Sequence, residues 1–190
     1  MKQFIIQYMI EHGLKIDFMT LGGIRNEANS DLDYFNDWLW FIYNNDFFIA
    51  KGTTDPGIYY TDHPMNKNGA FHLDLGYHKE IWRLRLHNNK YLALCDDWKT
   101  QKVKGWRDKN KNFIDDDNLD TSGNFGINWH YSTSKELINY ASAGCQVTNN
   151  KKFFDKSIKC AKESKQGLFS YLLLDIKEIP LNLKIDLGQC

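Results

Sequence analysis

Two stretches of the chain each contain a pair of strand-like runs of apolar residues separated by a polar turn. Residues 38–43 and 47–50 are aromatic and β-branched, and an Asn-Asn-Asp turn separates them. Residues 81–86 alternate with a period of two, and after a His-Asn-Asn-Lys turn the apolar run at 91–95 follows. The pattern predicts two β-hairpins, over residues 38–50 and 81–95.

A different period appears at residues 151–163. Phe154, Ile158 and Ala161 fall at positions that share one side of a helix, and Asn149 and Asn150 precede the segment as candidate N-caps. The spacing predicts a helix with a single buried stripe.

The remaining segments complete the expected architecture. Residues 168–176 are typical of a core strand, 55–69 of a loop, and 123–130 of a glycine-rich loop leading into a strand, whereas 2–11 fit a helix or a strand equally. We expect one mainly β (α+β) domain over residues 1–190 with one or two short helices, and residues 1–20 able to lie at its periphery.

The chemistry that the sequence suggests lies between two of these segments. Gly126-Ile127-Asn128-Trp129-His130 is followed closely by Ser142-Ala143-Gly144-Cys145-Gln146. A cysteine nucleophile needs a neighbouring base and backbone N–H groups aimed at the developing oxyanion, and small residues allow the backbone a close approach. The alternative is a buried core cysteine and an unrelated strand histidine.

The order of residues narrows the class of cysteine enzyme. All six histidines precede Cys145, which excludes the papain-like order of Cys before His. Cys95 alone among the four cysteines precedes a histidine, namely His130, but it sits in a strand-like run without a glycine turn and is interpreted as structural. The six are His12, His63, His72, His78, His87 and His130.

The order of His followed by Ser-x-Gly-Cys resembles the L,D-transpeptidase catalytic-domain family of bacterial cell-wall enzymes. The resemblance implies a β-sandwich-like core, with His130 as base and Cys145 as the nucleophile that attacks a peptidoglycan stem peptide. It also implies that the Tyr131 carbonyl orients the histidine, and that Ser142 and Gly144 form the turn that supports the oxyanion.

A second resemblance covers roughly residues 20–176. Residues 53–57 look like the Thr-Pro-x-Gly segment that begins the family's substrate-side hairpin, and the chain as a whole is similar to a set of phage and prophage cell-wall proteins. The shared segments are Asn36-Asp37, residues 53–57, Pro64-Met65-Asn66, Arg107-Asp108, residues 125–130 and residues 142–146.

One position departs from the family pattern. The family usually has an arginine two residues after its cysteine, where this chain has Val147. We expect Arg107 to point into the same cleft and replace that cation, the alternative being an ion pair with Asp108. Around the second hairpin, Tyr77, His78 and His87 are expected to border the cleft and bind substrate, with core packing as their alternative.

The charge and hydropathy of the chain limit which partners it can bind and where in the cell it can act. Lys plus Arg equals Asp plus Glu at 24 each, which excludes the basic footprint of a nucleic-acid binder. No run approaches the roughly 20 apolar residues of a membrane span, and residues 1–14 do not form a convincing secretory signal. We expect a monomer made in the bacterial cytoplasm and delivered to the periplasm or cell wall by a phage lysis system, tail or secretion device.

Metal sites have little support in the sequence. The four cysteines form no C-x-x-C pair, and the histidine spacings match no standard zinc site. Residues 108–116 place oxygen side chains at alternating positions, as an EF-hand loop does, although Phe113 stands where glycine belongs. We therefore expect no required cofactor, and leave open either a structural Ca²⁺ site or a solvated acidic turn at Asp108, Asn110, Asn112 and Asp116.

Two functions remain open at this point. The first is a cysteine-dependent hydrolase of peptidoglycan stem peptides, of L,D-carboxypeptidase or endopeptidase type, or an L,D-transpeptidase, acting through a thioacyl-enzyme. The missing arginine and the phage-like resemblance favour water as the acceptor. The alternative is a non-enzymatic phage structural or wall-binding module that retains the fold, with an aromatic cleft that binds glycan or peptide.

Overall fold

The mainly β fold is confirmed. A computed structural model describes residues 1–26, 33–97, 99 and 102–187, and the chain is 39% strand and 20% helix. Both predicted hairpins are present, with Trp40 opposite Ile49 in the first and Leu84 opposite Leu94 in the second. The predicted turns at residues 44–46 and 87–90 therefore connect strands that do pair with each other.

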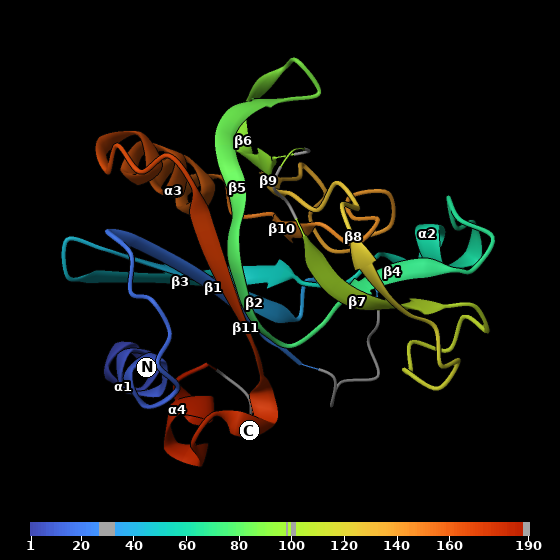
Figure 1. The fold of residues 1–190 in the computed structure, drawn as a ribbon, viewed down its shortest axis with the longest axis horizontal. Coiled ribbons are helices and arrows are strands. Elements are labelled where there is room, and N and C mark those ends of the chain that lie inside the picture. The colour runs from blue at the N-terminus through green and yellow to red at the C-terminus, as the bar shows by residue number, and fades with distance from the viewer. Residues whose placement is uncertain (27–32, 98, 100–101, 188–190) are drawn as a thin grey trace.

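The strands of the main sheet form a closed barrel (Figure 1). Two neighbouring pairs in it are parallel, β1 with β11 and β9 with β10, and the other pairs are antiparallel. The two faces of the expected sandwich thus belong to one continuous sheet. Its strands, in order around the closure, are β1 (Met19–Arg25), β11 (Phe169–Asp175), β5 (Gly76–His87), β6 (Tyr91–Asp96), β9 (Trp129–Tyr131), β10 (Gln146–Thr148), β3 (Asp46–Thr53) and β2 (Asp37–Tyr43).

A second, three-stranded sheet stands beside the first. It consists of β4 (Ala70–Leu73), β7 (Val103–Asp108) and β8 (Asp120–Gly123), all antiparallel. The turn between β7 and β8 projects from the end of the molecule opposite to α1 (Figure 1). This small sheet carries several of the side chains that the sequence pointed to as functional.

The predicted helix is α3 (Lys151–Glu163), and its N-cap is Asn150, whose side chain accepts a 3.0 Å hydrogen bond from the Phe153 N–H. The ambiguous N-terminal segment is α1 (Lys2–Glu11), which buries Ile5 and Met9. Two short helices, α2 (Ile58–Asp62) and α4 (Leu181–Asp186), were not predicted, and a 3₁₀ turn at Ile176–Glu178 precedes α4. No helix in the described part of the chain is long and apolar enough to span a membrane.

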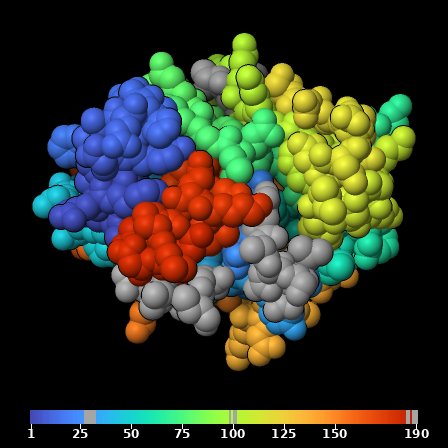
Figure 2. Space-filling model, turned by 90° about the horizontal axis from the view of Figure 1, so that it is seen from below, coloured from blue at the N-terminus to red at the C-terminus, as the bar shows by residue number. Residues whose placement is uncertain are grey.

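The helices cover different faces of the closed sheet. The largest buried cluster combines inward-facing side chains such as Trp82, Trp129 and Tyr171 with Phe153 and Phe154 of α3. A second cluster joins the outer face of β1, β2 and β11 to α1 and the C-terminal segment, and Figure 2 shows α1 in blue beside α4 in red on that face. The helix α3 therefore contributes to the same core as β9, whereas α1 and α4 lie on the other side of the sheet.

Candidate active site

The parallel pair β9–β10 places the predicted histidine and cysteine on one cavity, and no hydrogen bond joins their side chains among the described contacts. His130 is the register partner of Val147, and residues paired in this way direct their side chains to the same face of a sheet. Cys145 lies two residues before Val147 along the chain, so the alternation returns its side chain to that face. Both side chains line one cavity of about 960 Å³.

The His130 imidazole is held in one orientation. Its Nδ1 lies 3.2 Å from the Tyr131 carbonyl oxygen, and because a carbonyl only accepts, Nδ1 carries the proton. The Tyr91 hydroxyl donates to the same carbonyl at 3.2 Å. Burial and the nearby His87 lower the pKa of His130 to about 4. The ring is therefore neutral at physiological pH, with Nε2 as its unprotonated nitrogen.

The Cys145 thiol is also neutral. Burial raises its pKa to about 11, against which hydrogen bonds from the backbone and side chain of Asn128 act. Its Sγ lies 3.7 Å from the Gly126 carbonyl oxygen, to which the thiol donates. The resting pair is thus a thiol and an imidazole, not a thiolate and an imidazolium.

Ser142 fixes the turn that carries the cysteine. Its hydroxyl donates to the Cys145 carbonyl at 2.8 Å and accepts from the Gly144 N–H at 3.0 Å. Ser142 and Gly144 thus form one hydrogen-bonded turn, in which the Gly144 N–H donates to Ser142. The Cys145 N–H, by contrast, has no hydrogen-bond partner in the described part of the chain.

The backbone conformation and the surroundings of Gly144 both require a glycine. Its φ is +119°, a conformation that favours glycine, and a Cβ at this position would lie 2.6 Å from the Phe71 carbonyl oxygen. The small residue before Cys145 therefore allows the turn to pack against β4. The sequence had suggested that it made room for substrate.

Gln146 is a functional residue whose role the sequence did not reveal. It is fully buried, and its amide donates to the Thr54 and Gly144 carbonyls at 3.3 and 3.2 Å while its oxygen accepts from the Tyr171 hydroxyl at 2.6 Å. It ties the cysteine turn to the core of the closed sheet. Its only sequence signal was its place directly after the cysteine.

The segment 53–57 also contacts this turn. Thr53 pairs with Val147, and the Gly57 N–H donates to the Ser142 carbonyl at 2.9 Å. Val147, at the position where an arginine was expected, is completely buried against Phe35 and Ile138. That position packs the turn and offers no charge to the cavity.

One predicted substrate residue lines the cavity and two do not. The His87 ring stacks on His130 with 4.5 Å between ring centroids, and its Nδ1 is buried without a hydrogen-bond partner in the described residues. Tyr77 instead packs against the α1 side of the sheet, and its hydroxyl reaches the Lys15 carbonyl at 3.5 Å. His78 is buried against Tyr171, and its Nε2 donates to the Asp74 carbonyl at 2.9 Å.

Arg107 does not reach the cavity either. It lies on β7 of the small sheet, where its guanidinium donates to the Gly69 carbonyl at 3.0 Å and stacks over Phe71 and Phe125. Neither the replacement of the missing arginine nor the alternative pair with Asp108 is present among the described contacts. The Asp108 carboxylate, fully buried, accepts from the Asn112 and Phe113 N–H groups.

In the proposed Ca²⁺ loop the side chains form hydrogen bonds with one another. The amides of Asn110 and Asn112 donate to the two carboxylate oxygens of Asp116, at 2.7 and 3.0 Å. Within residues 1–26, 33–97, 99 and 102–187, no group of three or more His, Cys, Asp or Glu is placed to hold a metal ion. In this structure the oxygen atoms of Asp116 are thus engaged by the two asparagine amides.

The other cysteines are less suited to chemistry. Cys95 is buried on β6, and burial raises its pKa to about 12. Cys160 is buried on the inner side of α3, and Cys190 lies outside the described residues.

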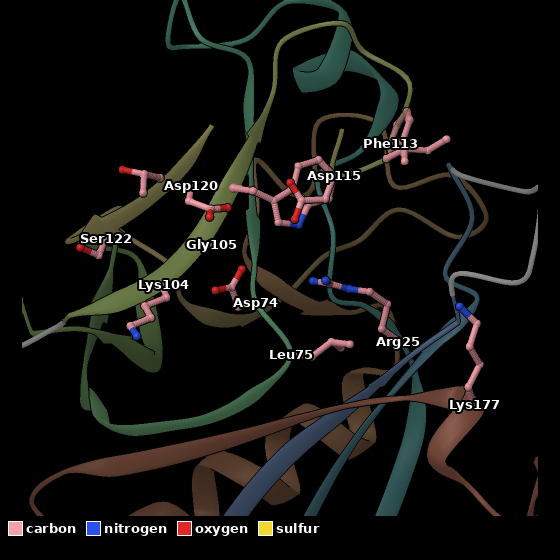
Figure 3. A pocket seen from close by; sticks show the side chains of 13 residues that line it. Arg25, Asp74, Leu75, Lys104, Gly105, Phe113, Asp115, Asp120, Ser122 and Lys177 are labelled. Carbon is pink, nitrogen blue, oxygen red and sulfur yellow. The ribbon is translucent and has the colours of Figure 1, made fainter. Parts of the chain in front are cut away.

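A second cavity of about 960 Å³ lies between the small sheet and the C-terminal end of β1 (Figure 3). Arg25, Lys104 and Lys177 line it together with Asp74, Asp115 and Asp120, and the Arg25 guanidinium extends toward Asp74. Its described lining includes no cysteine and no histidine. The cavity at His130 is the one whose described lining contains both a cysteine and histidines.

Comparison of the chain with protein-family models, curated proteins and solved structures finds no match. A function therefore has to be inferred from the contacts of the site itself.

Proposed function

We propose that the protein is a cysteine-dependent hydrolase of peptidoglycan stem peptides. The observation that carries the proposal is that His130 on β9 and Cys145 in the turn before β10 line one cavity, with Nδ1 of His130 bonded to the Tyr131 carbonyl. That bond leaves Nε2 to accept a proton. The cell-wall substrate is suggested by the order of His and Ser-x-Gly-Cys in the sequence.

The proposed reaction begins with a neutral pair. The Cys145 thiol gives its proton to His130 Nε2 as sulfur bonds to the amide carbon, and the Cys145 N–H stabilises the oxyanion. The C–N bond then breaks, His130 protonates the leaving amine, and a thioacyl-enzyme remains. Water attacks the thioacyl carbon, His130 takes its proton, and the thiol is released with a carboxylate product.

A transpeptidase would use the same first half-reaction and replace the water with an amine. No cationic side chain occupies the position of the missing arginine, because Val147 is buried there. This favours water as the acceptor. No step requires a metal ion.

A wall-binding module is the second candidate function. The raised pKa of Cys145 and the aromatic lining of the cavity favour it, since Tyr60, Tyr91, Tyr131 and Tyr140 could hold a sugar or peptide without chemistry. In that case Cys145 would serve only to pack the turn.

The two functions differ in their products. The protein should be incubated with purified peptidoglycan, and the soluble fraction analysed by mass spectrometry. Peptide fragments that have gained one water support the hydrolase, and new amide-linked peptides support the transpeptidase. A protein that sediments with the wall and releases no fragment would support the binding module.

A further inference from the structure

One stripe of α3 faces the cavity that holds Cys145. The lining positions are 151, 154, 155, 158, 159 and 162, which recur at intervals of three and four and so lie on one side of the helix. Three of these residues are lysines and one is Asp155. No other described lining residue of the cavity carries a full charge when its histidines are neutral.

The positive charge gathers at the C-terminal half of the stripe. Lys151 is neutralised by Asp155, whose carboxylate oxygens both lie 2.6 Å from its amine. Lys159 is 3.8 Å from Glu163, a looser contact with a residue that does not line the cavity. Lys162 has no ion pair with any described residue. Lys159 and Lys162 therefore present cations to whatever fills the cavity.

The length of the stripe sets the size of the occupant. At 1.5 Å per residue, the helix rises about 16 Å between Lys151 and Lys162. An extended peptide covers about 3.4 Å per residue, so about five residues fit along the stripe. Tyr91, Phe154 and Ile158 provide an apolar surface beside it.

We propose that this cavity is a groove for a short acidic peptide, whose carboxylates are bound by Lys159 and Lys162 while its scissile amide lies at Cys145. The inference rests on the proposed function for the position of the amide, and it names the substrate as the free-carboxylate form of a stem peptide. Lysine ammonium groups bind carboxylates as point charges without a fixed angle. The helix thus supplies the cations that neither Val147 nor Arg107 offers.

The test uses two synthetic stem peptides that differ only in charge, one with free carboxylates and one with every carboxylate converted to carboxamide. Binding is measured by calorimetry on the Cys145→Ala variant, so that no turnover interferes. We expect the free-carboxylate peptide to bind about tenfold more tightly than the amide form, and raised salt to remove most of the difference. In the further double variant Lys159→Met with Lys162→Met, that preference should fall to about twofold or less.

The matched control is Lys152→Met with Lys156→Met on the same background. It removes the same charge from the same helix at two exposed positions that do not line the cavity, and it should retain the preference. Methionine has a helix propensity close to that of lysine, so both doubles should fold alike. Equal preference in the two doubles, or equal binding of the two peptides from the start, would overturn the groove proposal.

Cleavage of the same free-carboxylate peptide by the unmodified protein separates this inference from the proposed function. Cleavage without charge preference refutes the groove and leaves the hydrolase. A lysine-dependent preference without cleavage refutes the hydrolase and leaves an acidic-peptide groove.

Discussion

At the scale of single residues, the neutral state of His130 and Cys145 determines how the pair can react. Their pKa values of about 4 and 11 both follow from burial, which disfavours the charged form of each group. In a pair of this kind the thiol transfers its proton to the imidazole during the attack, and no thiolate forms beforehand. Its activity should therefore persist well below the ordinary pKa of histidine.

The stacked His87 provides a test of that view. His87→Phe keeps an aromatic ring against His130 but removes the neighbouring charge that opposes its protonation. The pKa of His130 should rise, and the acid limb of kcat/KM should move from near pH 4 toward higher pH. The limb is measured on a soluble stem peptide, and the His130 ring proton resonance is followed by NMR as a readout independent of turnover.

His12→Phe is the control, because His12 is an exposed residue directly after α1 and does not line the cavity. An acid limb and a resonance that both stay in place in His87→Phe would show that His87 does not influence the base.

Gln146 leads to a second prediction at this scale. Gln146→Met removes the partners of the Tyr171 hydroxyl and the Gly144 carbonyl in a fully buried place. The free energy of unfolding should fall by about 2 kcal/mol or more, since buried polar groups left unpaired cost about 1–3 kcal/mol each. Chemical denaturation measures this free energy. Gln7→Met, at an exposed position of α1, should stay within about 0.5 kcal/mol of the parent, and similar losses in both would contradict the anchoring role.

At the scale of elements, the sequence predicted the helix and the hairpins that depend on residues within one segment. The two hairpins and α3 follow from alternation, turn residues and a helical stripe, all of which lie within one segment. The strands β9 and β10 have three residues each, which is too short for a period to show. Their parallel pairing depends on the path of the chain between them, residues 132–145, which no periodic pattern predicts.

The site was predicted in part for the same reason. The order of residues indicated His130 and Cys145, and their strands place both on one face. Tyr77, His78 and His87 were treated alike because they flank one hairpin, but β5 is irregular between them. Glu80 has a φ of +54° and the register with β11 shifts nearby. Tyr77 and His78 are neighbours and so face opposite sides of the sheet, and His87 lies at the other end of this 12-residue strand.

At the scale of the whole molecule, buried histidines should make the fold sensitive to acid. Burial lowers the pKa of His78 to about 4 from 6.5. Between these two pH values the unfolded chain binds a proton that the folded chain does not, so stability falls as pH drops. His130 acts in the same direction, whereas Asp37, whose pKa is raised to about 6 chiefly by burial, acts in the opposite one.

His78→Gln isolates one of these contributions, because every other titrating group is common to both proteins. The amide can still donate to the Asp74 carbonyl. From pH 7 to pH 4 the variant should lose about 1–3 kcal/mol less stability than the parent. Urea unfolding at several pH values measures the difference, and parallel pH curves for the two proteins would contradict the assignment of His78.

The central claim is that Cys145 is a nucleophile served by His130, and its replacement tests this most directly. Peptidoglycan is incubated with the unmodified protein, with Cys145→Ala and with Cys95→Ala, and released peptides are quantified by mass spectrometry. The account predicts that Cys145→Ala releases none while keeping its unfolding midpoint within a few degrees, because only about 1 kcal/mol of packing is lost, and that Cys95→Ala retains activity. Fragment release by Cys145→Ala, with loss of release in Cys95→Ala, would contradict the account and transfer the nucleophile's role to Cys95.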